Sequence, residues 1–184
     1  MATTGLVSHF VAMARNNAWA NHRLLSACEA LTAAEFAAPR TGFFPSLRAT
    51  FNHILWVDRY YINAVAGHDA LRRYSGPDPD FADARSMRLA QTESDRRLIA
   101  VCENQTDATL AADCILPRPS RKPPPTKTAA VLEHLFQHQI HHRGQAHAML
   151  SSTSIKPPQL DEFFLAGEQD LRRDELRALD LPET

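Results

Sequence analysis

The sequence lacks the features that direct a protein to a membrane or to nucleic acid. No apolar run approaches the roughly 18 residues that a membrane-spanning helix needs, and the N-terminus has neither the basic nor the apolar region of a signal peptide. Positive and negative charges nearly balance, with 20 Lys and Arg against 21 Asp and Glu, whereas nucleic-acid binders normally present a basic face. We therefore expect neither a membrane partner nor a nucleic-acid partner.

Cysteine and strand patterns are also scarce. Cys28, Cys102 and Cys114 are an odd number without CxxC spacing, which argues against a disulfide framework and indicates reduced thiols in a cytoplasmic protein. Alternating strand patterns are nearly absent, and no repeat of solenoid period is present. The 184 residues, 44% of them hydrophobic and 22% charged, are typical of one globular domain over residues 1–184.

Four long segments carry apolar residues at the spacing of an amphipathic helix. They cover about residues 5–31, 46–66, 83–104 and 126–152. Ser46 and Asp83 are the expected N-caps of the second and third helices, and Thr32 with Glu35 forms a capping-box pattern that opens a short further turn. Four long helices joined by short to medium connections predict an all-α fold, a four-helix bundle.

The remaining segments are predicted to be short and irregular. Residues 110–127 contain several prolines and basic residues, which exclude a helix and leave at most a short extended hairpin flanking a loop. Asp161 is expected to cap a short helix, and a polar, surface-lying helix is expected over about 168–179. The predicted bundle core covers about residues 6–166, and a polar C-terminal extension with short additional helices follows over 167–184.

Histidine is concentrated in the fourth helix, where five of the nine histidines lie between residues 134 and 147. His138 and His142 are four residues apart, which places both imidazoles on one helix face with their Cβ atoms about 5–6 Å apart. They belong to a core-facing stripe that consists of Val131, Leu135, His138, His142, Gln145 and Met149. Buried imidazoles need partners, because an unsatisfied polar group in a core costs a few kcal/mol. One metal ion would satisfy both; the alternative is hydrogen bonding between the rings or to neighbouring carbonyls.

His53 is the expected third metal ligand, because its helix is apolar on more than one side and should lie deep in the bundle. Asp58, about 140° farther around that helix, is expected to support the ligands from behind or to form an ion pair with Arg143. His134 and His141 lie off the core-facing stripe and are weaker ligand candidates. The single histidines elsewhere are predicted to be surface residues: His9, His22 and His68.

Three histidines with an open coordination position suit Zn²⁺ best, with Ni²⁺ and Fe²⁺ as alternatives. Such a site has room for water, whose pKa a metal lowers to about 7, or for a thiol held as thiolate. His141 is a weak candidate for a proton shuttle and Gln145 for a bond to a ligand, with surface and packing roles as the alternatives. Gly144 is expected to allow close helix approach. Cavity-lining or simple core positions are expected for Asn17, Trp19 and Tyr61.

These residues resemble the motifs of the DinB family, four-helix metalloproteins of the DinB/YfiT-like superfamily. The resemblance rests on Asn-His-Ile-Leu-x-x-Asp at 52–58 and His-x-x-His-His-Arg-Gly-Gln at 138–145. Three further segments are similar to the family: NAWANHRLL at 17–25, FFPS at 43–46 and PPQLDEFF at 157–164. The resemblance to the family covers about residues 6–166.

The resemblance implies a four-helix bundle with a metal triad at His53, His138 and His142, and a homodimer packed through bundle helices. The superfamily includes mycothiol-dependent maleylpyruvate isomerase and bacillithiol transferases, in which the metal activates a low-molecular-weight thiol. The resemblance therefore implies a small-molecule substrate and a thiol cosubstrate. The proline-rich, basic segment 117–125 and the tail beyond Ala166 depart from the family pattern, so the substrate itself does not carry over.

Three functions are compatible with the sequence. The first is a metal-dependent enzyme, a thiol S-transferase, isomerase or hydrolase that acts on a small electrophile. The second is a non-enzymatic metal-binding stress-response protein in which a structural metal holds the bundle together. The third is a metal-free bundle with a histidine-lined ligand pocket. The residue pattern alone does not identify the metal, the thiol or the substrate.

Overall fold

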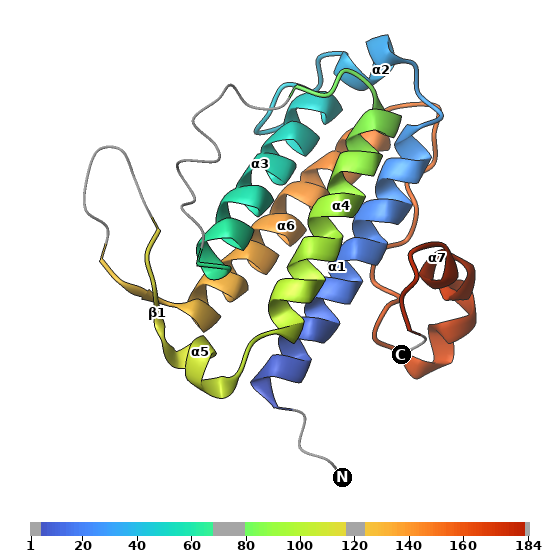
Figure 1. Ribbon diagram of the computed structural model, residues 1–184. Helices are drawn as coiled ribbons and strands as arrows, with labels where there is room; N and C mark the ends of the chain where they lie inside the picture. Colours follow the sequence, from blue (N-terminus) through green and yellow to red (C-terminus); the bar gives the residue numbers. More distant parts are fainter. Residues whose placement is uncertain (1–4, 68–79, 117–123, 183–184) are drawn as a thin grey trace.

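Four long helices lie side by side and make up most of the molecule (Figure 1). The computed structural model describes residues 5–67, 80–116 and 124–182. The long helices are α1 (Leu6–Cys28), α3 (Leu47–Val65), α4 (Ala84–Glu103) and α6 (Thr128–Leu150). Helix α1 packs mainly on α4, and α3 packs mainly on α6. The predicted all-α bundle is confirmed. In these ranges no helix is long and apolar enough to span a membrane.

The helix starts follow the capping residues of the sequence. The Ser46 side chain accepts a hydrogen bond from the backbone N–H of Ala49 at the start of α3, and Asp83 caps α4 in the same way. Thr32 and Glu35 form the predicted capping box, which opens the short helix α2 (Ala33–Ala37). These side chains satisfy backbone donors that have no partner within the helix, so the predicted N-caps are confirmed.

A short hairpin precedes the fourth long helix. Strand β1 (Asp113–Cys114) pairs antiparallel with β2 (Thr126–Lys127), which confirms the predicted hairpin. A short helix that the sequence pattern did not indicate, α5 (Asp107–Ala111), comes before it. Most of the proline-rich departure from the family pattern, and His68, lie outside the described residues.

The bundle interior consists of two apolar clusters, one toward each end of the four helices. The first includes Phe10, Ile62, Leu98 and Leu135, and the second includes Leu25, Phe51, Met87 and Met149. Seven buried polar residues, contributed by all four long helices, lie between these two sets. We call them the polar layer: Asn17, Asn21, Asp58, Gln91, Asp95, Gln139 and Arg143.

The C-terminal tail lies on the surface of the bundle and packs on it through a few apolar residues. It forms a 3₁₀ helix, η1 (Ala166–Leu171), followed by α7 (Arg173–Ala178), and Figure 1 shows both beside α1. Leu176 and Phe163 pack around the fully buried Trp19 of α1. The helical segment expected over 168–179 is present as these two short helices, and its apolar residues Leu176 and Leu179 are buried against the bundle.

Polar contacts anchor the same tail. The indole N–H of Trp19 donates to Glu175 at 2.9 Å, and Arg23 forms ion pairs with Glu162 and Glu175. The expected helix capped by Asp161 is absent, since residues 161–165 are irregular in the structure. The backbone there follows α1 and carries Glu162 and Phe163 to it instead of closing a helical turn.

We expect Leu176→Ala to lower the free energy of unfolding by about 2–3 kcal/mol, because it leaves a cavity against Trp19. Leu176 is 2% exposed, whereas Leu171 in the same tail is 56% exposed. Leu171→Ala is therefore the matched control and should change stability by less than about 0.5 kcal/mol. Urea denaturation measures both. Equal effects of the two substitutions would contradict the packing described here.

Candidate metal centre

Helices α3 and α6 bring three histidines together. His53 comes from the first half of α3, and His138 and His142 come from successive turns of α6. One ring nitrogen from each lies within 4.8 Å of the other two, and the Nε2 atoms of His53 and His138 are 3.0 Å apart. Nitrogen ligands about 2.0–2.1 Å from a tetrahedral ion lie about 3.4 Å from one another. The three side chains can therefore hold one divalent ion with small adjustments.

The site is partly open to solvent. His142 is buried, whereas His53 and His138 are partly exposed. His53 contacts both other rings, with ring centroids 5.0 Å from His138 and 4.8 Å from His142. Because two of the three rings are partly exposed, a small molecule could reach an ion bound by them.

A hydrogen-bonded chain orients His142. Its Nδ1 lies 2.9 Å from Oε1 of Gln145, and Nε2 of Gln145 lies 3.0 Å from a ring nitrogen of the exposed His141. An amide oxygen only accepts, so His142 must carry its proton on Nδ1. Its Nε2 lone pair is thereby left for a metal, which is how supporting partners usually fix a histidine ligand.

Burial keeps the imidazoles of His138 and His142 neutral. It lowers the pKa of His138 to about 3, with a further contribution from the neighbouring His142 and His53 rings. Burial also lowers the pKa of His142, although the Gln145 hydrogen bond partly offsets this change. Nδ1 of His138 is buried with no hydrogen-bond partner among the described residues. Near pH 7 these rings therefore offer lone pairs to a metal without losing a proton first.

Two phenylalanines form an apolar wall beside the histidines. The centroid of the Phe44 ring lies 4.4 Å from the ring centroid of His53 and 5.4 Å from that of His142. The ring centroid of Phe43, which is 75% exposed, lies 5.9 Å from that of His142. Gly42 passes so close to Met149 that an added Cβ would collide with the methionine methyl group. The similarity of residues 43–46 to the family was the only sequence signal for this wall.

The polar layer lies behind the histidines and joins all four long helices. Asp58 accepts hydrogen bonds from Gln91 at 2.8 Å and from Gln139. Asp95 accepts from Asn17 and Asn21, each at 3.1 Å. Through Gln139, the neighbour of His138, this layer is connected to the helix that carries two of the histidines.

Arg143 completes the layer. One of its guanidinium nitrogens, Nη1, donates to the side-chain oxygens of Asn17 at 2.7 Å and Asn21 at 3.0 Å. The expected ion pair between Asp58 and Arg143 is absent among the described residues: Asp58 accepts from Gln91 and Gln139, whereas Arg143 donates to Asn17 and Asn21. Neither residue hydrogen-bonds to a histidine of the site, so any support they give to the ligands acts through the helices.

Charges in the polar layer are strongly perturbed by burial. Burial, with a smaller effect of Asp95, raises the pKa of Asp58 to about 8. Burial also raises the pKa of Asp95 to about 6, against the effect of its amide donors. It lowers the pKa of Arg143 to about 10, so the guanidinium stays charged near pH 7. At that pH Asp58 is mostly protonated, and Asp95 is the carboxylate that balances Arg143.

The other expected side chains lie in varied surroundings. His9, His134 and His141 are exposed, but His22 is half-buried and its pKa is lowered by burial, so the surface prediction for His22 was wrong. Gly144 does not serve close helix approach, since a Cβ built on it meets nothing within 4 Å. The remaining three candidates do not touch the metal centre by any described contact: Asn17 belongs to the polar layer, Trp19 packs against the tail, and Tyr61 packs on His134.

The bundle and its site define the class: an all-α protein with a three-histidine candidate metal centre between two helices. The chain belongs to the DinB family, whose family model matches residues 1–174. The solved structure of a DinB-like protein from Bacillus subtilis is similar, with a TM-score of 0.57 at 18% sequence identity. That match covers 84% of this chain and 96% of the other, and it supports the fold. No curated protein matches the chain.

We expect the metal-free protein to lose stability as the pH rises from about 6.5 to 8. Folding raises the pKa of Asp58 from 3.8 to about 8. Such a carboxyl contributes its full stability below the unfolded pKa, and this contribution is lost as the pH rises through the folded pKa. The loss over this window is on the order of 1 kcal/mol for Asp58. His138 has the opposite effect, because folding lowers its pKa from 6.5, but only the last part of its gain in stability falls inside the window. Asp95, with a folded pKa of about 6, contributes mainly below the window.

Asp58→Asn should remove this pH dependence, because the amide keeps the size of the side chain and has no proton to lose. Urea unfolding at several pH values measures the effect. Asp107→Asn, at an exposed helix start, is the matched control and should keep the wild-type slope. A flat wild-type profile between these pH values would contradict the assignment.

Proposed function

We propose that this protein is a metal-dependent enzyme in which His53, His138 and His142 hold a divalent ion. At its open coordination positions the ion would activate a low-molecular-weight thiol or a water molecule for transfer, isomerisation or hydrolysis of a small electrophile. The observation that carries the proposal is three histidine nitrogens within 4.8 Å of one another on a site where two rings stay partly exposed. Membership in the DinB family supports it.

The exposure of the site favours catalysis over a structural metal. Structural zinc sites are usually closed by four protein ligands, whereas catalytic sites use three and keep one position open. Among the described residues, the group of possible metal ligands at this site contains only the three histidines. Phe43 and Phe44 occupy the neighbouring surface, so the side of the site that they cover favours an apolar part of a substrate.

The protein residues have distinct tasks in this proposal. A bound divalent ion would supply Lewis acidity and lower the pKa of a coordinated water or thiol. Gln145 holds the His142 ring in one tautomer and orientation, and His141 at the end of the same chain is exposed and can take up or release a proton. The polar layer holds α6 in place beneath these groups.

Three finer points stay part of the proposal. Zn²⁺ is the favoured ion over Ni²⁺ and Fe²⁺, because a three-nitrogen set with an open position suits it best. A cytoplasmic location is supported by Cys28, Cys102 and Cys114, which are all buried free thiols. A homodimer remains an expectation from the family resemblance.

We expect the protein, purified without nickel resin, to contain about one equivalent of a divalent metal. His142→Ala should weaken Zn²⁺ binding by about 100-fold or more, since removing a direct ligand costs more than the 10- to 100-fold typical of a supporting residue. His134→Ala, on the same helix but exposed, is the matched control. Elemental analysis and competition with a zinc chelator measure both. Wild-type protein without stoichiometric metal, even after reconstitution, would exclude every metal-based function.

We expect the metal-loaded protein to turn over at least one substrate in a panel of small electrophiles offered with low-molecular-weight thiols or with water alone. Chelation should abolish the reaction, added metal should restore it, and His53→Ala should lower kcat/KM by about 100-fold or more. His134→Ala should keep wild-type activity. If the whole panel gives no turnover while metal removal lowers the unfolding midpoint, the structural-metal function is the correct one.

A further inference from the structure

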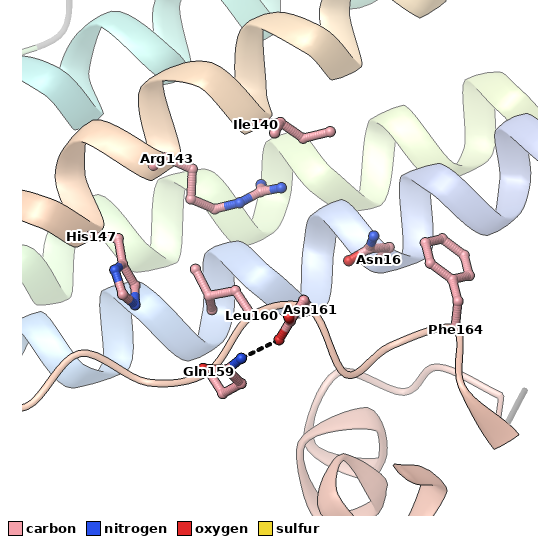
Figure 2. A pocket seen from close by; sticks show the side chains of 9 residues that line it. Asn16, Ile140, Arg143, His147, Gln159, Leu160, Asp161 and Phe164 are labelled. Carbon is pink, nitrogen blue, oxygen red and sulfur yellow. Dashed lines mark hydrogen bonds between the residues drawn. The ribbon is translucent and has the colours of Figure 1, made fainter. Parts of the chain in front are cut away.

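A hollow of about 480 Å³ lies between α1, α6 and the irregular segment 159–164 (Figure 2). It is separate from the candidate metal centre. Gly144 of its wall is about 160° around α6 from His142, and the metal centre lies between α3 and α6. We call it the α1–α6 hollow. Its volume is within the range of about 300–1,000 Å³ that is usual for small-molecule sites.

A buried guanidinium faces the α1–α6 hollow. Figure 2 shows Arg143 reaching from α6 toward α1, and the residue is only 6% exposed. Its Nη1 is held by Asn17 and Asn21, whereas Nε and Nη2 have no hydrogen-bond partner within the described part of the chain. Neither of these two atoms is fully shielded from solvent, and Arg143 is one of the residues that line the hollow. A guanidinium presents two parallel N–H groups that match the two oxygens of a carboxylate.

Gly144 adds to the room in the hollow. Glycine in the middle of a helix lowers helix stability by about 1 kcal/mol relative to alanine. No protein atom within 4 Å of a built Cβ explains why a glycine stands here, yet the residue lines the hollow beside Arg143. The space that a side chain at position 144 would fill is part of the hollow.

Apolar side chains form the outer part of the wall. Ile140 and Phe164 are 48% and 54% exposed, and Leu160 also lines the hollow. An apolar group seated here would remove their surfaces from water, which is favourable in proportion to the area covered. Asp161 lies at the exposed rim, where it accepts a hydrogen bond from Gln159 and where solvent and salt weaken its repulsion of an anion.

Asn16 lines the hollow from α1. Its side-chain oxygen is shielded from solvent and has no hydrogen-bond partner among the described residues, so we assign it no contact with the ligand.

We propose that the α1–α6 hollow is a metal-independent binding site for a small organic carboxylate with an aliphatic or aromatic group. The carboxylate accepts hydrogen bonds from Nε and Nη2 of Arg143. The apolar group packs on Ile140, Leu160 and Phe164. This site does not depend on the proposed enzymatic function, because none of its groups belongs to the metal centre.

Titration calorimetry and amide NMR on metal-stripped protein test the proposal, with isocaproate as probe and its neutral amide, isocaproamide, as comparison. Stripping the metal removes coordination of the carboxylate at the three histidines. We expect isocaproate to bind with a dissociation constant of about 1 mM or tighter, with NMR shifts centred on the amide of Gly144. The amide should bind about tenfold more weakly, because it loses the charge-assisted pair with Arg143.

Two variants locate the site. Gly144→Leu should weaken isocaproate binding about tenfold or more, since the new side chain enters the hollow from a position where an added Cβ meets no atom within 4 Å. Gly167→Leu, at another glycine whose Cβ would meet nothing within 4 Å, is the matched control and should bind like wild type. Arg143→Lys should also weaken binding, because a point charge replaces the planar fork.

Three results would overturn the proposal. The first is no binding of isocaproate to folded, metal-stripped protein at about 10 mM, and the second is equal binding of the amide. The third is dimerisation through this face, seen as a dimer in sedimentation that Gly144→Leu converts to a monomer while Gly167→Leu does not. That result would assign the exposed apolar wall to a second copy of the chain.

Discussion

The bundle depends on a buried guanidinium and a buried carboxylate that never touch. Arg143 and Asp95 are bridged by Asn17 and Asn21, whose oxygens face the arginine and whose amide nitrogens face the aspartate. A charge removed from water without partners costs several kcal/mol. These hydrogen bonds form only when α1, α4 and α6 have one particular position along their axes relative to one another. A shift by one helical turn would separate the groups and leave the charges without partners.

Asp58 brings α3 into the same arrangement through its bonds to Gln91 and Gln139. The height at which α3 meets α6 decides whether His53 faces His138 and His142, so the polar layer and the candidate metal centre depend on one another. We infer that the layer specifies the helix register more than it adds stability. Apolar residues of similar volume would often stabilise such a site as well or better.

Helix α6 carries different chemistry on its different faces. His138 and His142 are directed to α3, Gln139 and Arg143 face the interior, and Gly144 lines the α1–α6 hollow. This distribution explains why a segment so rich in polar residues forms a buried helix. It also explains why Arg143 had an ambiguous role in the sequence: its neighbour is a candidate ligand, but its own side chain is directed to α1.

The sequence alone determined the four long helices, the N-caps of α3 and α4 and the pairing of His138 with His142, because these follow from spacing and from contacts within a few residues. His53 was inferred from the apolar surroundings of its helix, and the structure places it beside the other two. Only the tertiary structure decided the partners of Asp58 and Arg143, the open space at Gly144, the burial of His22 and the docking of the tail on Trp19. Each of these depends on residues far apart in the chain, whose distance is set by how the helices pack and not by any local pattern.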